Sequence, residues 1–384
     1  MHRLSTALGL PQHRFASIHV VGTNGKSSVT RMIAALLEAH GLATGACVSP
    51  HPLRWSERVL IRGEEIASDA FETSVETTAR AAESVNRSLE EGEEVTQFEV
   101  ATAAAFVAFA SAKVDVAVVE AGLGGRLDAT NTIPSRVTVL TSIGLDHTEW
   151  LGDTELEIAA EKLAVLRDQT KLVRGCVSAD VAAVAERTAA ERGAETIAAP
   201  EDPGEDVVLR AAGPFQRRNF ALACAAAEAF LGRLDPEAVA GVAATLTVPG
   251  RLERLPGDPP VVLDVAHNPD GAEALAEGLP ELAEGRPVIA CLAVLAEKDA
   301  RAMIAALAPV VSHLVCTKLP ARRRSLGADE LAGAAREVGV EAEAIEDFDA
   351  ALARGRQLAR ETGGVLLVTG SHYVLAPVRM ALHL

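Results

Sequence analysis

The sequence has few aromatic residues, few cysteines and no long apolar run, and each absence excludes a class of protein. No stretch reaches the roughly 18 to 20 apolar residues of a membrane-spanning helix, so we expect no membrane association. The five cysteines include no Cys-x-x-Cys pair, which favours reduced thiols over a disulfide framework or a zinc site. The first residues, Met1-His-Arg-Leu-Ser5, lack the apolar segment of a signal peptide, and we therefore expect a cytoplasmic protein.

Positive charge is also scarce. The 36 lysine and arginine residues are outnumbered by 53 acidic residues, which gives a formal net charge of −17. A surface this acidic repels phosphate backbones, which argues against a general nucleic-acid-binding function. An anionic substrate would need a local basic pocket. Six of the 36 cations are lysines, so each lysine is more informative than usual.

Short apolar runs alternate with alanine-rich segments of helical spacing, which predicts a parallel, doubly wound α/β sheet. The first series of expected strands and helices covers residues 18–21, 28–40, 101–112, 114–119, 137–140, 158–166 and 172–173. The second series of expected strands covers residues 261–264, 288–292, 314–316 and 365–368.

The pair Pro249-Gly250 separates the two series and is typical of a hinge. We therefore predict two α/β domains. The first, at residues 1–248, contains a parallel sheet and a phosphate-binding loop. The hinge covers 249–252, and a smaller Rossmann-like domain covers 253–384.

The phosphate-binding loop follows the first expected strand. The segment from Ile18 to Ser28 reads Ile-His-Val-Val-Gly-Thr-Asn-Gly-Lys-Ser-Ser. Glycines let backbone N–H groups close around phosphate, lysine binds the β and γ oxygens, and a hydroxyl binds Mg²⁺. The spacing is shorter than the eight-residue Walker pattern, so an ordinary glycine turn is the alternative. The nucleotide-binding candidates are Thr23, Asn24, Gly25, Lys26 and Ser27.

Further short segments follow in order along nearly the whole chain. They are Gly22–Lys26, Ser49–His51, Ser56–Arg58, Thr96–Glu99, Glu120–Asn131, Leu145–Thr148, Glu161–Lys162, Pro249–Arg251, Asp264–Pro269, Lys298–Asp299 and Gly370–Ser371. Gly22-Thr-Asn-Gly-Lys26 resembles the nucleotide loop of the Mur ligase superfamily. Together the segments resemble the folylpolyglutamate synthase/dihydrofolate synthase family of that superfamily.

The resemblance implies an ATP- and Mg²⁺-dependent ligase that adds L-glutamate to dihydropteroate, to reduced folates, or to both. ATP would phosphorylate the pterin-side carboxylate, and the glutamate amine would attack the acyl phosphate. Ser49, Glu120 and His147 match the family's metal ligands, and Lys162 matches a lysine that CO₂ carbamylates to bind a second Mg²⁺. From position alone, Glu120 ends an apolar strand, where α/β sheets place ligand residues.

The remaining site residues are also implied by the resemblance. Those matching the pterin site are Thr96, Gln97, Phe98, Glu99 and Leu127. Those matching ATP contacts are Asn219, Arg251 and Asp264, while His267 is expected near the incoming glutamate or the acyl phosphate. Lys26, Lys162 and His267 are therefore the catalytic candidates.

The residues alone leave simpler alternatives open for several of these positions. Phe98 could be a core residue, and Asn219 could cap an alanine-rich helix. Arg126 could pair with Asp128 or contact an anion. Arg322–Arg324 could bind glutamate carboxylates or form a solvated turn.

The chain departs from the family at a few positions. A serine follows Lys26 where relatives usually have glycine, so either Ser27 or Ser28 could bind Mg²⁺. Glu161-Lys162 is followed by Leu-Ala-Val where Ala-Gly-Ile is common, and 17 residues precede Ile18, fewer than in relatives. None of these differences removes a candidate catalytic residue.

Two other functions remain as alternatives. A Mur-type peptidoglycan ligase would share the ATP loop, and a nucleotide-binding regulator would bind ATP without catalysis. For the ligase reading, the expected partners are small molecules, and we expect a monomer. The sequence does not decide between the two ligase activities or the number of glutamates added.

Overall fold

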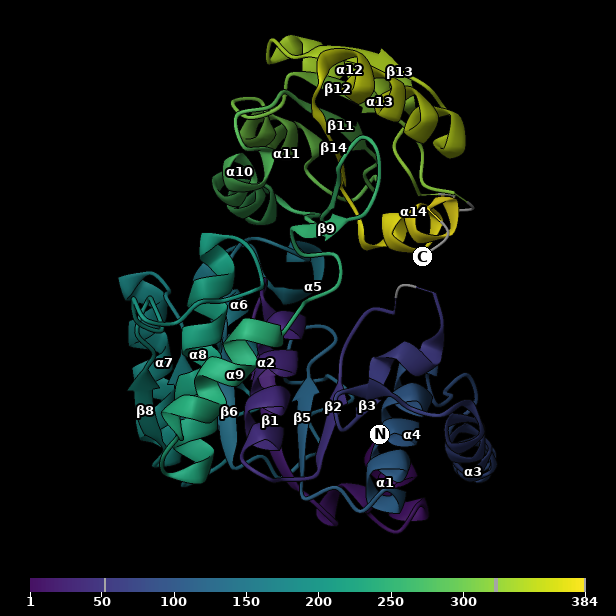
Figure 1. Cartoon of the computed structure of the whole chain (residues 1–384). Coiled ribbons are helices and arrows are strands. Elements are labelled where there is room, and N and C mark those ends of the chain that lie inside the picture. Colours follow the sequence, from purple (N-terminus) through teal and green to yellow (C-terminus); the bar gives the residue numbers. More distant parts are fainter. Residues whose placement is uncertain (52, 321–323, 383–384) are drawn as a thin grey trace. The chain divides into compact units, whose positions relative to one another are not determined.

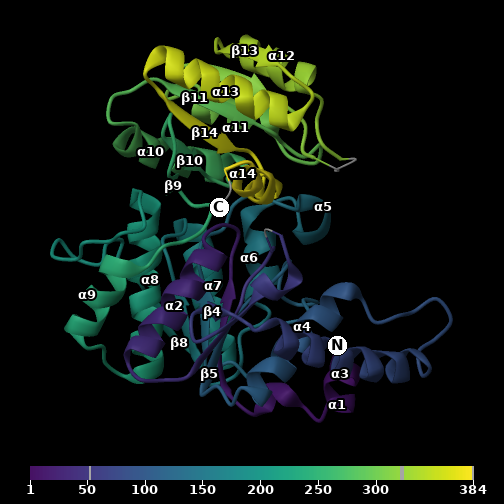
Figure 2. The same cartoon turned by 45° about the vertical axis from the view of Figure 1, so that its right-hand side comes forward.

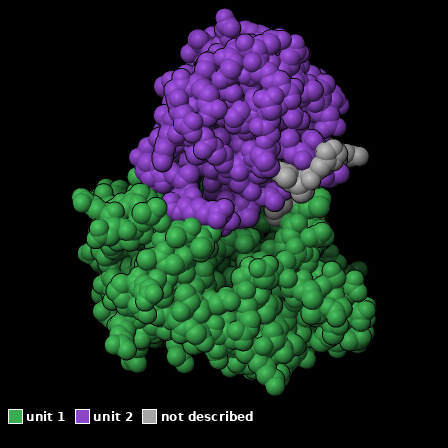
Figure 3. Space-filling view, in the orientation of Figure 1, with its two compact units in different colours: residues 1–208, 217–246 green, residues 209–216, 247–384 purple. Residues whose placement is uncertain are grey.

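The computed structural model describes residues 1–51, 53–320 and 324–382, which form two compact α/β units. Unit 1 consists of Met1–Val208 and Arg217–Leu246, and unit 2 of Leu209–Gln216 and Thr247–Leu384 (Figure 3). Residues 209–216 thus group with unit 2, although they precede the last segment of unit 1. The predicted hinge at 249–252 lies near the start of the last segment of unit 2.

Unit 1 contains an eight-stranded sheet in the order β4-β3-β2-β5-β1-β6-β7-β8. Its strands are β1 Ala16–Val21, β2 Thr44–Cys47, β3 Val59–Ile61, β4 Glu64–Glu65, β5 Val116–Glu120, β6 Val137–Leu140, β7 Lys171–Arg174 and β8 Glu195–Ala198. The strands from β2 to β8 in this order are parallel, whereas β3 and β4 are antiparallel additions at one edge. The predicted parallel sheet is confirmed with this correction: the sheet is mixed.

Helices cover both faces of this sheet (Figures 1 and 2). They are α1 His2–Ala7, η1 Pro11–His13, α2 Lys26–Ala39, η2 Trp55–Arg58, α3 Ser68–Asn86, α4 Gln97–Ser111, α5 Thr148–Leu151, α6 Glu155–Leu163, α7 Ala179–Arg192, α8 Pro214–Leu231 and α9 Pro236–Thr245. The side chains of α4 pack against β5 and β2 around Phe106 and Phe109, and those of α6 and α7 pack against β6 and β7. Burial on both faces explains the continuous apolar strands of the sequence.

Unit 2 contains a six-stranded sheet in the order β13-β12-β11-β14-β10-β9, with β9 antiparallel to β10. Its strands are β9 Glu253–Leu255, β10 Val261–Leu263, β11 Val288–Leu292, β12 His313–Cys316, β13 Glu341–Ala344 and β14 Val365–Thr369. Its helices are α10 Pro269–Ala283, α11 Ala300–Leu307, α12 Ala328–Glu337, α13 Phe348–Thr362, η3 His372–Val374 and α14 Leu375–Ala381. Two apolar clusters, one on each face of the sheet, form its core.

The sheet of unit 1 brings distant parts of the sequence together at its carboxyl edge. Val20 of β1 pairs with Glu120 of β5, and Val21 pairs with Leu140 of β6. The glycine loop after β1, the end of β5 and the loop after β6 therefore emerge side by side, at the edge where parallel sheets hold ligands.

Some expectations on secondary structure were incomplete or wrong. The strands β2, β3, β4, β8, β9 and β13 were not predicted. Asn219 does not cap a helix, because α8 begins five residues earlier, at Pro214. All five cysteines are free thiols, as expected. Within the residues described, no helix is both long and apolar enough to cross a membrane.

Candidate active site

The glycine loop is shaped by two residues that only glycine suits. Gly22 has φ of +148°, and a Cβ there would lie 1.9 Å from Thr141 Oγ1. Gly25 has φ of +85° and directly precedes α2, and a Cβ there would lie 2.7 Å from Asn219 Oδ1. Because both sites exclude a side chain, the backbone can approach a ligand at the start of α2.

Lys26 is the first residue of α2, and its side chain folds back over the loop. Its Nζ donates hydrogen bonds to the carbonyl oxygens of Gly22 and Thr23, at 3.1 and 2.9 Å. The ammonium group is thus held beside the backbone that would surround phosphate, the arrangement a phosphate-binding lysine needs.

The segment after β6 holds the glycine loop from the other side. The N–H groups of Thr23 and Asn24 donate to the carbonyl and hydroxyl oxygens of Ser142, at 2.7 and 3.0 Å. Thr141 Oγ1 donates to the Asn24 carbonyl at 2.6 Å, and Thr23 Oγ1 to the Gly144 carbonyl at 3.2 Å. Sequence analysis did not identify Thr141 and Ser142, although hydroxyl residues directly after a buried strand were the available signal.

A buried carboxylate joins the start of α2 to the loop after β2. Glu120 is 4% exposed at the end of β5. Its Oε2 accepts the Ser27 hydroxyl at 2.8 Å and the Ser49 N–H at 2.9 Å. Ser27 Oγ also lies 3.1 Å from the Ser49 carbonyl oxygen. The structure thus brings three of the predicted site residues together.

The choice between the two serines follows from their surroundings. Ser27 points to Glu120, whereas the Ser28 hydroxyl is buried and has no hydrogen-bond partner among the described residues. Ser27 is therefore the serine that can share a ligand with Glu120.

His147 lies in the loop after β6, directly before α5. It has φ of +53° at the residue before α5, and its Nε2 is 3.9 Å from Asp146 Oδ1. Among the described residues, no group of three His, Cys, Asp or Glu side chains is arranged to hold a metal ion. One carboxylate and a serine hydroxyl, completed by phosphate and water oxygens, are instead the donor set that a hard cation such as Mg²⁺ prefers.

Lys162 is buried in the last turn of α6, 5% exposed. Its Nζ forms no hydrogen bond or ion pair with any described residue. Burial and, to a lesser extent, the positive charge of Lys26 lower the pKa of Lys162 to about 7, against the opposing effect of Asp146, Asp128 and Glu161. A buried lysine with this pKa is partly uncharged near neutral pH and available as a nucleophile.

The glycine-rich loop after β5 packs directly on α6. A Cβ on Gly125 would lie 2.6 Å from the Lys162 carbonyl oxygen. Arg126 donates from its Nε to Glu161 Oε2 at 3.0 Å, so it pairs with Glu161 and not with Asp128.

Asp128 instead fixes the loop from within. Its Oδ2 accepts the Leu123 N–H at 2.8 Å, and its Oδ1 accepts from the backbone and hydroxyl of Thr130. Because the Thr130 hydroxyl donates to Asp128, it accepts from His19 Nε2 at 2.8 Å. Burial, with a contribution from Arg167, lowers the pKa of His19 to about 3, so this histidine is neutral. The sequence analysis did not identify His19 as part of the hydrogen bonds that hold this loop.

The residues predicted to bind pterin divide into two groups. Phe98 lines a small cavity of about 10 Å³ together with two of the predicted metal ligands, Ser49 and Glu120, and a Cβ on Gly122 would lie 2.3 Å from the Phe98 ring. Thr96 and Glu99 form a capping box at the start of α4. The Glu99 carboxylate also contacts the amine of Met1. Gln97 is exposed, and Leu127 is 92% exposed.

Arg251, Asp264 and His267 belong to unit 2. Asp264 is buried, and its two oxygens accept the N–H groups of Leu252 and Ala266, both at 2.8 Å. Burial raises the pKa of Asp264, against the opposing effect of Arg251 and these hydrogen bonds. The His267 ring lies 4.6 Å from that of His372, and its Nδ1 is 3.0 Å from the Val265 carbonyl oxygen. Arg322 and Arg323 lie outside the described residues.

Comparison with known proteins decides the family. The Mur ligase middle domain matches residues 20–206, and the Mur ligase glutamate ligase domain matches residues 250–372. A dihydrofolate synthase/folylpolyglutamate synthase from Mycobacterium tuberculosis is 37% identical, over 87% of this chain and 76% of its own length. The chain belongs to the folylpolyglutamate synthase/dihydrofolate synthase family of the Mur ligase superfamily.

Solved structures of this family share the whole architecture. Folylpolyglutamate synthase from M. tuberculosis, complexed with ADP and AMPPCP, matches with a TM-score of 0.92 and 34% identity, over 99% of this chain and 93% of the other. E. coli FolC in complex with DHPP and ADP matches with a TM-score of 0.85 and 28% identity, over 100% and 93%. Family membership excludes the alternative of a Mur-type peptidoglycan ligase.

The two adjacent serines provide a matched pair of variants. We expect Ser27→Ala to weaken Mg²⁺-dependent ADP binding about 10- to 100-fold, the usual cost of disturbing a metal site. Ser28→Ala should leave that binding within about twofold, because its hydroxyl has no hydrogen-bond partner among the described residues. Titration calorimetry with and without Mg²⁺ measures both. Equal effects of the two variants would contradict the assignment of Ser27.

Proposed function

We propose that this chain joins L-glutamate to dihydropteroate, to reduced folates, or to both, as a monomeric cytoplasmic enzyme that consumes ATP. Family membership supports the reaction class. The observation that carries the proposal is the glycine loop with Lys26 above it and Ser27 directed at the Glu120 carboxylate.

The chemistry explains why such a loop is needed. A carboxylate does not react with an amine, so the pterin carboxylate oxygen first attacks the γ-phosphorus of ATP and ADP leaves. The glutamate amine then attacks the acyl carbon, phosphate leaves, and the amine loses a proton. In the first step the enzyme acts by positioning two anions and neutralising their charge.

The loop and its lysine supply part of this neutralisation. The N–H groups at the start of α2 and the Lys26 ammonium group can surround the phosphates of ATP. Asn219, which lies beside Gly25 on α8, is proposed as the adenine-side contact, and Thr23 and Asn24 are proposed nucleotide contacts of the phosphate-binding loop.

The residues beside the loop fit Mg²⁺. Ser27 and Glu120 would hold the ion, with Ser49 and His147 as the further candidates named by the resemblance. When bound, Mg²⁺ neutralises phosphate charge that the protein groups leave uncompensated. Glu120 keeps Ser27 in place through the hydrogen bond already formed.

For the acceptor, we propose that the ring of Phe98 contacts the pterin. Phe98 lies close to Ser49 and Glu120, with which it lines one small cavity, so a pterin in contact with its ring would lie next to the phosphate site. Thr96 and Glu99 would act by fixing the start of α4. Gln97 and Leu127 remain candidate contacts from exposed positions.

Unit 2 would supply the remaining groups. Arg251 and Asp264 are proposed ATP contacts, and His267 is proposed to lie near glutamate or the acyl phosphate. Asp264 would also act through the backbone, since its carboxylate holds Leu252 and Ala266.

We further propose that Lys162 is carbamylated. Its uncharged amine would add to the carbon of CO₂ and release a proton, which yields a carbamate with two oxygens. Burial, the nearby charge of Lys26 and the absence of a hydrogen-bond partner among the described residues support this. The carbamate would offer the oxygen ligands that a second Mg²⁺ prefers.

The direct test of the reaction is ADP release with dihydropteroate and then with tetrahydrofolate, each with and without glutamate. We expect turnover with at least one acceptor and an amide product that requires glutamate. Lys26→Ala should abolish turnover, and Ser28→Ala should retain it. ATP binding with no product from either acceptor would instead indicate a regulator and refute the proposal.

The carbamate has its own test. Lys162→Arg should lower kcat at least 100-fold although it keeps the charge, because arginine forms no carbamate. Lys162→Ala should regain part of its activity with added acetate or formate. Lys171→Arg is the control and should keep normal activity, since either side chain can donate to the Ala229 carbonyl. Full activity of Lys162→Arg, or an unmodified lysine mass in active enzyme at saturating bicarbonate, would rule out the modification.

A further inference from the structure

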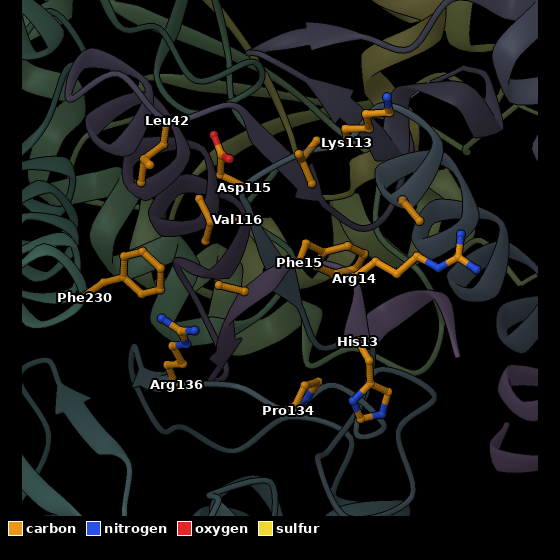
Figure 4. A pocket seen from close by; sticks show the side chains of 13 residues that line it. His13, Arg14, Phe15, Leu42, Lys113, Asp115, Val116, Pro134, Arg136 and Phe230 are labelled. Atoms are coloured by element: carbon orange, nitrogen blue, oxygen red, sulfur yellow. The ribbon is translucent and has the colours of Figure 1, made fainter. Parts of the chain in front are cut away.

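A second hollow lies in unit 1, at the opposite edge of the sheet from the glycine loop. Its volume is about 890 Å³, and it is lined at the amino ends of β1, β5 and β6 and by the end of α8 (Figure 4). β1 has six residues at about 3.3 Å each, so about 20 Å separates this groove from the glycine loop. A ligand here would not compete with a nucleotide at the loop.

The groove concentrates positive charge in a strongly acidic protein. Arg14, Lys113 and Arg136 line it and are exposed, and His13 adds a further cation when protonated. Among the residues described, none of these four side chains has a hydrogen bond or an ion pair. By contrast, the exposed Arg126 is paired with the carboxylate of Glu161. The groove therefore has cationic groups whose counter-charge the protein does not supply.

One carboxylate, that of Asp115, belongs to the lining, and it is already engaged. Its Oδ2 accepts the Ala43 N–H at 2.7 Å. This bond joins the start of β5 to the segment before β2, which gives Asp115 a structural role. The lining as a whole thus favours an anion of more than one charge.

The groove also offers apolar surface for a flat ring. The Arg136 guanidinium lies 6.0 Å from the centroid of the Phe230 ring. Figure 4 shows these two side chains on one side of the groove, with Arg14 and His13 on the other and Pro134 and Phe15 between them. A volume of this size lies within the roughly 300–1,000 Å³ range of small-molecule sites.

We propose that this groove is a second binding site, for a small organic polyanion that carries a flat ring system. The ring would lie against Phe230 and Pro134, and the anionic groups would pair with Arg14, Lys113 and Arg136. Two molecules connected with the reaction have this chemistry: a pterin bearing several glutamates, and an adenine nucleotide. The choice of these two molecules rests on the proposed function. The charge and shape of the groove are observed independently of it.

The elements around the groove also reach the active site. β1 runs from the groove into the glycine loop, and α8 carries Phe230 near one end and Asn219 nearer the other. A ligand in the groove would therefore contact the same two elements that hold Gly22 and Gly25.

The test counts binding events on the full chain by calorimetry, with a pentaglutamyl tetrahydrofolate and ATP as separate probes. At least one of the two probes should bind two molecules per chain, one at the active site and one in the groove. Arg14→Glu and Arg136→Glu should each weaken the second event at least tenfold. Arg187→Glu changes an exposed arginine on α7 that has no ion pair with any described residue, and it should leave the second event unchanged. Added salt should also weaken it, because the cations are exposed.

Two further measurements keep the test decisive. Arg136→Gln removes the charge without introducing a negative one. The melting temperature of each variant shows whether weaker binding comes from the lost charge or from unfolding. Tripolyphosphate, which has no ring, should bind the groove at least tenfold more weakly than the preferred probe. A single binding event for both probes, or a second event insensitive to both glutamate variants, would overturn the site. Equal binding of tripolyphosphate would overturn the proposed ligand class.

If the protein shows no ligase activity with either acceptor, the proposed function is refuted. The number of binding events at the groove would still test the second site.

Discussion

The hydrogen bonds of one buried carboxylate determine how the active site is assembled. Glu120 ends the central strand β5, next to β1 in the sheet, and accepts from Ser27 on α2 and from the backbone of Ser49 after β2. These residues are distant in sequence, and the parallel register alone brings them to one edge. Removing such a charge from water is costly unless hydrogen bonds compensate, so the carboxylate strongly favours the one arrangement that supplies them.

The glycine loop is held in place before any ligand arrives. Its backbone N–H groups and a carbonyl are bonded to Thr141 and Ser142, and the Thr23 hydroxyl is bonded to Gly144. The Lys26 ammonium group donates to the loop carbonyls of Gly22 and Thr23. Because the loop is already ordered, little of the binding energy of a nucleotide is needed to order it. Such preorganised groups stabilise the charge that develops during phosphoryl transfer. The loop after β5 is fixed separately, through Asp128 and Thr130 to the neutral ring of His19.

Local sequence signals predicted the elements that carry strong patterns. The apolar run into Gly22-Thr-Asn-Gly-Lys26 and the carboxylate at the end of β5 were readable because strand, glycine and charge occur in one short segment. β2 was missed because Thr44-Gly-Ala-Cys47 has little strand character, and Gly45 is required there by close contact with Phe109. The choice of Ser27 over Ser28 and the partner of Arg126 depend on long-range contacts that no local pattern encodes.

We propose that the charge of Glu120 creates a Mg²⁺ site beside the glycine loop. Glu120→Gln keeps the shape and one acceptor oxygen but removes the charge. The most direct measurement is the affinity for ADP with and without Mg²⁺, together with the melting temperature. We predict that the gain in affinity from Mg²⁺ falls at least tenfold in Glu120→Gln, with no loss of melting temperature. An unchanged gain from Mg²⁺ would contradict this account.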